Sequence, residues 1–190
     1  VDFNAQDPVF MKDVSFYFFS LPLWRQILQY GLTLCILALA GVVALYYFKG
    51  VLSLASLKSG SGKGRSRVHV SLLAALIFLL LAAKAYLDRF EILFGNHDVF
   101  SGANYADLHA RVPMLTVLAV AAFIGALLWV YNAFASKNKA AMVAVLLYFV
   151  VLFGGNLYPA VIQKFIVSPN ELDKESPQIQ KNIDATLQAY

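Results

Sequence analysis

The sequence predicts an all-α, polytopic membrane helix bundle with four transmembrane helices, accompanied by interfacial and C-terminal amphipathic helices. Hydrophobic residues make up 60% of the chain and charged residues 14%, whereas soluble proteins average roughly 45–50% and about 25%. Four apolar runs are each long enough to cross about 30 Å of hydrocarbon. Lys and Arg gather in the short connections between these runs, as in loops that stay on the cytoplasmic side.

Residues 1–25 are predicted to form an interfacial segment on the outer side of the membrane. The stretch DPVFMKDVSFYFF is too short and too charged to span the bilayer. Asp7 as a cap and Pro8 in the first turn predict a short helix lying in the interface. A packed aromatic plug is the alternative. The Ser20-Leu21-Pro22 step is expected to break the chain before the first span.

The membrane domain is predicted to cover residues 26–167. Its four spans are expected at about 27–48, 68–87, 112–131 and 140–158. Each span holds about 20 residues, which at 1.5 Å per residue crosses the hydrocarbon core with some tilt. Residues 168–190 are more polar and are predicted to form an extracytoplasmic helical tail.

The segment LKSGSGKGRSR at residues 57–67 sets the predicted topology. It carries bases and no acid in a Gly- and Ser-rich context, namely Lys58, Lys63, Arg65 and Arg67. Such a loop is retained in the cytoplasm and meets anionic lipid headgroups of the bilayer. All eleven acids of the chain then fall on the opposite side, so both termini are predicted to be extracytoplasmic. The net charge of +4 is thus topological, and no nucleic-acid partner is predicted.

The outer loop between the second and third spans holds two imidazoles and two carboxylates that could bind a zinc-like ion: His97, Asp98, Asp107 and His109. Their spacing matches no tight ligand motif. Asp107 and Arg111 stand four residues apart and are expected to pair across one helical turn. An ordered, salt-bridged loop is therefore the preferred interpretation, and no metal is predicted.

Polar residues inside the spans could line a transport pathway. Lys84 lies late in the second span, where a lysine usually snorkels to the interface but could also serve an ion or substrate. Asn156 follows two glycines and precedes Pro159. That pattern indicates either a broken helix beside a site or close helix packing through small residues, and packing is preferred. Pro113 predicts that the third helix starts or kinks there.

No cofactor or catalytic centre is predicted. His69 could ligate a haem or chlorophyll, as could His97 or His109, but a lone interfacial histidine is more often a hydrogen-bonded cap. Cys35 is the single cysteine, which excludes an internal disulfide. The sequence offers no Ser/His/Asp or Cys/His arrangement, so the protein is not predicted to be an enzyme.

The tail begins with a capping box, Ser168 to Glu171, which predicts a helix start. One face of the helix that follows is apolar and is expected to bind a partner: Ile179, Ile183, Leu187 and Tyr190. The stripe needs either the outer face of this bundle, a following domain or another subunit.

Three stretches resemble uncharacterised protein family 0182. They are DPVFMKDVSFYFFSLPLWR (Asp7 to Arg25), RFEILF followed by GANYADLHARVP (Arg89 to Pro113), and VSPNELDKESPQIQKNIDATLQAY (Val167 to Tyr190). The family comprises large multi-pass membrane proteins of bacteria, including cyanobacteria, and some archaea. The resemblance implies a partial or reduced member in the bacterial cytoplasmic membrane, or in the thylakoid membrane if cyanobacterial. It implies no biochemical function.

These observations favour an integral membrane structural or accessory subunit that binds partner proteins, or missing parts of a longer chain, through its outer loops and C-terminal helices. A transporter or channel component is the first alternative, favoured if Lys84 and Asn156 line one water-filled cavity. A pigment- or haem-binding membrane subunit is the second, favoured if a histidine approaches a tetrapyrrole.

Overall fold

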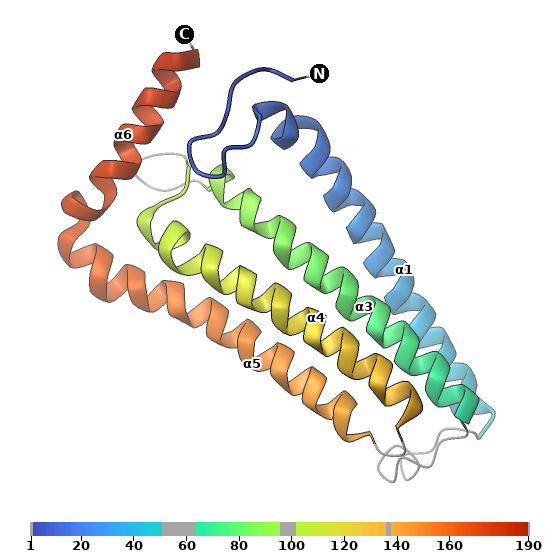
Figure 1. The fold of residues 1–190 in the computed structure, drawn as a ribbon. Coiled ribbons are helices and arrows are strands. Elements are labelled where there is room, and N and C mark those ends of the chain that lie inside the picture. The colour runs from blue at the N-terminus through green and yellow to red at the C-terminus, as the bar shows by residue number, and fades with distance from the viewer. Residues whose placement is uncertain (1, 51–63, 96–101, 136–137, 190) are drawn as a thin grey trace. The chain divides into compact units, whose positions relative to one another are not determined.

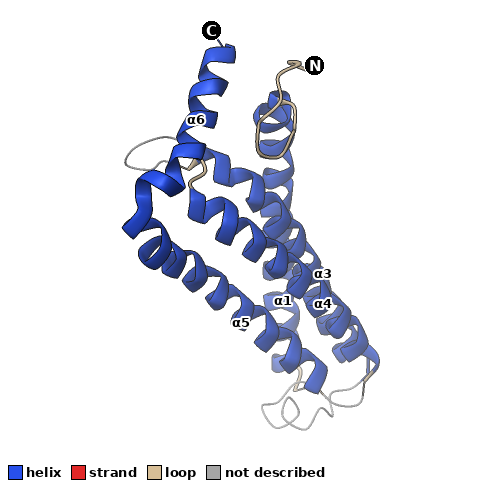
Figure 2. Cartoon of the chain, turned by 60° about the vertical axis from the view of Figure 1, so that its left-hand side comes forward, coloured by secondary structure: helices blue, strands red, loops and turns tan. Residues whose placement is uncertain are grey.

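The computed structural model describes residues 2–50, 64–95, 102–135 and 138–189. Within these ranges the chain forms helices joined by loops (Figure 2), and no strand occurs among them. The main helices follow one another along the chain as coloured in Figure 1: α1 (Leu21–Phe48), α3 (Gly64–Glu91), α4 (Val112–Phe134), α5 (Lys139–Ile162) and α6 (Glu171–Ala189). Four helical stretches, Phe16–Phe48, Gly64–Phe94, Asp107–Phe134 and Lys139–Asp184, are long and apolar enough to cross a membrane. The predicted all-α, four-span class is confirmed.

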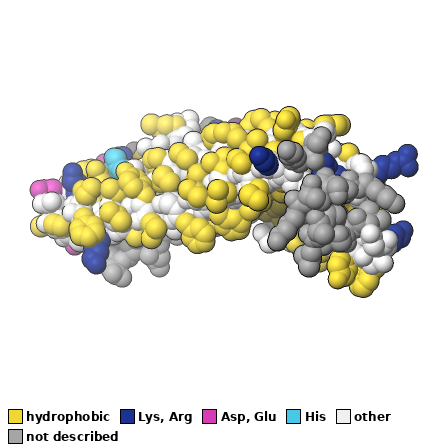
Figure 3. Space-filling view, turned by 90° about the horizontal axis from the view of Figure 1, so that it is seen from below, with side chains coloured by type: hydrophobic (Ala, Val, Ile, Leu, Met, Phe, Trp, Pro, Cys, Tyr) yellow, Lys and Arg dark blue, Asp and Glu magenta, His cyan; other side chains and the backbone are white. Residues whose placement is uncertain are grey.

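Large hydrophobic side chains are exposed along all four long helices, for example Leu37, Leu79, Leu127 and Leu146. Hydrophobic side chains also dominate the face drawn in Figure 3. A water-soluble protein rarely exposes a contiguous apolar surface of this extent, whereas lipid tails accept it without cost. The exposed apolar surface is therefore suited to contact lipid tails.

The chain divides into two compact units. Unit 1 comprises Val1–Gln26, Ala85–Thr116 and Phe153–Tyr190, and unit 2 comprises Ile27–Lys84 and Val117–Leu152. Each of the four long helices thus has one end in each unit. Both chain ends fall in the same unit as the connection from α3 to α4.

Three π-helical turns explain how the helical path continues through three of the prolines. They are η1 (Phe16–Ser20), η3 (Asp107–Arg111) and η4 (Gln163–Val167), and each ends two residues before a proline, at Pro22, Pro113 and Pro169. Proline has no N–H, and its ring clashes with the carbonyl four residues earlier. The extra residue in a π turn relieves that clash, because the residue before each proline donates to the carbonyl five positions back. The break predicted at Ser20 to Pro22 is therefore wrong, and at Pro113 the helix runs on with a local widening.

The N-terminal segment differs from the predicted interfacial helix. Residues 8–10 form only a turn, and helix begins at residue 14. Asp7 does act as a cap, since its carboxylate accepts the N–H groups of Val9 and Phe10, each at 2.8 Å. The chain then leaves helical geometry at Met11, whose φ is +54°, and Asp13 caps the actual helix by accepting the N–H of Ser15 at 2.8 Å. Asp7 therefore caps backbone N–H groups as predicted, but it stabilises a turn and not a helix.

The aromatic residues of this segment pack as a cluster in unit 1, which is the alternative interpretation of the stretch. Tyr17, Leu21 and Phe90 are buried, and Phe10 and Phe16 pack against them. The ring centroids of Phe10 and Phe16 lie 5.0 Å and 5.2 Å from that of Phe90, edge to face, a favoured geometry for aromatic pairs. These contacts fix the entry to α1 against the end of α3.

The carboxylate of Asp13 makes the N-terminal loop sensitive to acid. Hydrogen bonds from the side chain and the backbone of Ser15, and from the backbone of Phe3, lower the pKa of Asp13 below its usual value of 3.8. A lowered folded-state pKa means that the stabilisation is complete above about pH 3.8 and is lost as the pH falls through the folded-state pKa. We expect hydrogen exchange at the amides of Phe3 and Ser15 to accelerate, beyond the intrinsic rate, only below that pH. Asp13→Asn should remove this pH dependence of hydrogen exchange. An unchanged pH dependence in this variant would show that the Asp13 carboxylate does not cause it.

Unit 2 has its own core, in which helices α3, α4 and α5 meet. Phe78 of α3 packs with Ala126 of α4 and Ala144 of α5, all buried, and the ring centroid of Tyr148 lies 5.5 Å from that of Phe78. Small residues on α4 and α5 let the helices approach closely, as is usual in membrane bundles. The large ring on α3 fills the space that they leave.

Helix α5 continues through both glycines and Pro159 without a break. A Cβ at Gly155 would lie 3.7 Å from Met114, an ordinary van der Waals distance, and a Cβ at Gly154 would meet nothing within 4 Å. The broken helix is therefore not formed, and the preferred packing interpretation stays a prediction.

Candidate partner-binding surface

The C-terminal helix α6 is held in unit 1 by a carboxylate. Glu175 is only 7% exposed, and its two oxygens accept the backbone N–H of Tyr105 at 3.3 and 3.1 Å. Tyr105 occupies the first turn of the helix that leads into α4, where backbone N–H groups lack helical partners and the helix dipole is positive. An acid on α6 therefore caps the N-terminus of another helix.

That helix also has a local cap that tightens the same turn. The backbone N–H of Asp107 donates to Asn104 Oδ1 at 2.7 Å, and the backbone N–H of Asn104 donates to Asp107 Oδ2 at 3.3 Å. This reciprocal arrangement is a capping box with Asn and Asp in the two roles. The ion pair expected between Asp107 and Arg111 is also present, with a closest distance of 3.7 Å.

Further polar contacts join α6 to residues 102–105. Asn182 lies against Gly102, whose φ is +132° and where an added Cβ would meet the Asn182 amide at 3.2 Å. The ammonium of Lys174 lies 5.1 Å from the centroid of the Tyr105 ring, a cation–π contact. Gln178 is 7% exposed. The face of α6 that packs on its own unit is therefore polar.

The apolar stripe of α6 points elsewhere. Ile183 is 47% exposed and Leu187 is 72% exposed, and Leu172, on the same side at helical spacing, is 83% exposed. Ile179 is half-buried at the border with the polar face, and Tyr190 lies outside the described residues. Three of the four residues predicted to bind a partner therefore lie on or beside an exposed apolar stripe.

The predicted capping box at Ser168 does not begin a new helix. Residues Ser168–Asn170 form a short 3-10 segment, η5, between η4 and α6. The hydroxyl of Ser168 donates to the carbonyl of Gln163 at 3.0 Å, so it points back into the preceding turn. The backbone N–H of Ser168 donates to the carbonyl of Gln163 in the preceding π turn, so the helical path runs from α5 into α6.

Of the four candidate metal ligands, only Asp107 and His109 lie within the described residues, and each has other contacts. His97 and Asp98 lie outside the described residues. Asp107 is engaged by its capping box and by Arg111, and His109 stacks on the Tyr105 ring with centroids 4.1 Å apart. Among the described residues no group of three His, Cys, Asp or Glu side chains could hold a metal ion.

The other predicted residues are spread over both units. In unit 2 the hydroxyl of Tyr46 lies 2.7 Å from Nδ1 of His69, an exposed side chain at the start of α3. Lys84 is half-buried near the end of unit 2, and Asn156 is exposed in unit 1.

The topology residues are described only in part. Arg65 and Arg67 lie in the first turn of α3, with Arg65 exposed and Arg67 half-buried. Lys58 and Lys63 lie outside the described residues.

Sequence reasoning missed the residues that hold the helix ends together in unit 1. Arg25 near the start of α1 pairs with Glu91 and Asp88 at the end of α3, and Glu175 caps the turn at Tyr105. The Asn-x-x-Asp spacing at residues 104–107 could have revealed the local cap. The pairings between distant segments have no signal in the sequence of a single chain.

The fold and these surfaces define a polytopic membrane helix bundle whose C-terminal helix packs on its own unit through polar residues. The family model described as Uncharacterised protein family (UPF0182) matches residues 1–190, and the chain belongs to this family. It is 35% identical to a UPF0182 protein of Trichodesmium erythraeum over 100% of this chain and 21% of the relative. The identity is 37% to a relative from Cupriavidus necator, with the same shares covered, and 36% to one from Frankia alni, over 99% of this chain and 18% of the relative. The chain thus spans about a fifth of the length of these relatives. No solved structure matches.

Proposed function

We propose that this chain is a structural part of a membrane protein, without catalysis, whose helix α6 binds another protein segment through the stripe formed by Leu172, Ile179, Ile183 and Leu187. The observation that carries the proposal is that the two faces of α6 differ in burial and polarity. Its buried residues are polar and hold it to its own unit, while its apolar residues are exposed. An apolar helix face outside the hydrocarbon region is stabilised only when a partner covers it.

The occupant that we propose is a further segment of the same, longer polypeptide. Two facts support this choice. The relatives are about five times as long as this chain, which covers 21% of the first two, so a family protein holds ample additional surface. The residues beside the stripe are charged and polar, including Gln180 and Asp184, as is typical of the rim around an apolar interface core.

The test is site-specific photo-crosslinking in the full-length family protein in its native membrane. A photoreactive residue at position 183 or 187 should crosslink to another segment of the same polypeptide, located by peptide mass spectrometry. The same residue at position 181, on the opposite side of α6, is the matched control and should not crosslink there. Equal crosslinking from all three positions, or crosslinks to lipid alone, would overturn the proposal, and a separate protein in stoichiometric yield would overturn the choice of occupant.

Two double variants test whether the same interface contributes to the stability of the full-length protein. We expect Ile183→Asn combined with Leu187→Asn to lower the melting temperature of the full-length protein, because burial of two aliphatic side chains contributes about 2–5 kcal/mol when a partner covers them. Lys181→Asn combined with Asp184→Asn alters the exposed polar face without changing net charge and should leave melting unchanged. The proposal fails if both double variants have the same melting temperature as the parent protein in a thermal unfolding assay in detergent.

A further inference from the structure

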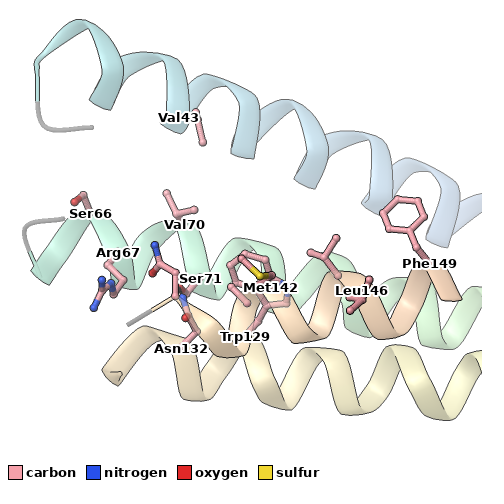
Figure 4. A pocket seen from close by; sticks show the side chains of 13 residues that line it. Val43, Ser66, Arg67, Val70, Ser71, Trp129, Asn132, Met142, Leu146 and Phe149 are labelled. Atoms are coloured by element: carbon pink, nitrogen blue, oxygen red, sulfur yellow. Dashed lines mark hydrogen bonds between the residues drawn. The ribbon is translucent and has the colours of Figure 1, made fainter. Parts of the chain in front are cut away.

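Unit 2 contains a pocket that none of the predicted roles uses. Its volume is about 550 Å³, within the range of small-molecule sites. Helices α3, α4 and α5 line it together with Val43 of α1. Figure 4 shows that its labelled lining residues are sorted by polarity: Arg67, Ser71 and Asn132 gather at one end, while Leu146 and Phe149 extend away at the other.

The polar end contains hydrogen-bonding atoms that lack partners among the described residues. Asn132 is 2% exposed and donates from Nδ2 to Ser71 Oγ at 3.0 Å, but its Oδ1 accepts no described bond. Arg67 donates from Nη1 to the carbonyl of Ala135 just beyond α4, whereas its Nη2 is buried and unpaired. Nε1 of Trp129 is likewise buried and unpaired. Buried polar atoms are almost always bonded in native proteins, so these atoms point to a ligand.

The chemistry of these atoms selects an anion with a hydroxyl group. Arg67 Nη2 is a donor that carries a permanent positive charge, which favours phosphate oxygens, and Trp129 Nε1 is a further donor that lines the same pocket. Asn132 Oδ1 is an acceptor and needs a donor, such as a headgroup hydroxyl. The bond from Arg67 to Ala135 fixes the guanidinium in place, so the free half is pre-oriented.

The apolar end selects an acyl chain. Most of the wall is hydrophobic, including Met142, Leu146 and Phe149. A free phosphate ion would make no favourable contact with these side chains, whereas an acyl chain would. Helix α1 ends and helix α3 begins beside the loop predicted to be cytoplasmic, and the cytoplasmic leaflet is the one enriched in anionic lipids. We propose that this pocket binds one anionic phospholipid with a hydroxylated headgroup, with the phosphate on Arg67 and an acyl chain along α5.

The test measures lipid selectivity in the full-length protein. The protein is placed in nanodiscs of phosphatidylcholine containing a minor share of phosphatidylglycerol with the same acyl chains, and the lipid retained after transfer to detergent is counted by native mass spectrometry. The parent protein should retain phosphatidylglycerol in preference to phosphatidylcholine. Arg67→Gln should reduce that preference about tenfold or more, since a hydrogen bond to a charged group is lost. Excess inorganic phosphate should not displace the lipid, and displacement would identify a free-phosphate site instead.

Arg65→Gln is the matched control, because Arg65 carries the same charge in the same turn of α3 and is exposed. It should keep the preference, and equal losses in both variants would overturn the proposal in favour of general surface charge. Trp129→Phe removes only the Nε1 donor and should weaken retention about two- to fivefold. This second variant decides the question even if Arg67→Gln does not fold, and full retention in Trp129→Phe would then reject the site.

Discussion

Replacing Asp7 with alanine is expected to destabilise the N-terminal part of unit 1 by about 2–4 kcal/mol. The carboxylate is 8% exposed and accepts three hydrogen bonds of 2.8 Å, from the N–H groups of Val9 and Phe10 and from the hydroxyl of Tyr17. Alanine would leave all three donors without the partner that now satisfies them, and an unsatisfied buried donor costs more than the bond itself contributed. The measurement is unfolding of the purified protein in mixed micelles.

Asp2→Ala is the control for this prediction, since Asp2 is exposed in the same segment and carries the same charge. It should have little effect. Tyr17→Phe removes one of the three donors and should cost about 1 kcal/mol. The double variant should be less destabilised than the sum of the two single variants, because they share one hydrogen bond. An Asp7→Ala protein as stable as the Asp2→Ala protein would show that the turn contributes nothing to folding.

The four membrane-spanning helices could be predicted because each depends only on local composition. A run of about 20 apolar residues in lipid has to satisfy its backbone hydrogen bonds internally, and an α-helix does so. The pair between Asp107 and Arg111 was predictable for the same reason, since residues four apart meet on any helix. Local rules therefore predicted the fold class and one ion pair.

The prolines show where local rules fail. Pro22, Pro113 and Pro169 each indicate a helix end, yet each follows a π turn that lets the helix continue. The cost of widening the turn is offset by packing on the rest of unit 1, as with Leu21 in the aromatic cluster. Such compensation is a tertiary effect, and the sequence around a proline does not encode it.

The sequence predicts the apolar face of α6 but not the inward packing of its polar face. Helical periodicity identifies Ile183 and Leu187 as one stripe, but a stripe normally packs inward, and here the neighbouring polar residues do so. Glu175 packs inward because a helix N-terminus at Tyr105 needs an acceptor. The pocket in unit 2 was not predictable, since residues from four helices line it and no single segment carries its pattern.

The second large effect is expected at Gly125 of α4, which packs tightly against Phe78 of α3. A Cβ added to Gly125 would lie 2.7 Å from Cε1 of Phe78 and closer still to Cδ1. The Phe78 ring has little room to move, because Trp129 and Tyr148 contact it and the buried Ala144 lies against it. Overpacking of this kind typically costs about 1–3 kcal/mol, so Gly125→Ala should lower the melting temperature in detergent.

The comparison that isolates this clash uses Gly41 of α1. A Cβ at Gly41 meets nothing within 4 Å, and alanine is the better helix former by about 0.5–1 kcal/mol, so Gly41→Ala should be neutral or slightly stabilising. Shortening the opposing ring, in Phe78→Leu combined with Gly125→Ala, should recover part of the loss, because the added methyl then occupies the vacated space. If Gly125→Ala and Gly41→Ala behave alike, or if Phe78→Leu adds its full cost on top of Gly125→Ala, the two helices are not held by this contact. A partial recovery would instead locate the close approach of α3 and α4 at this one ring.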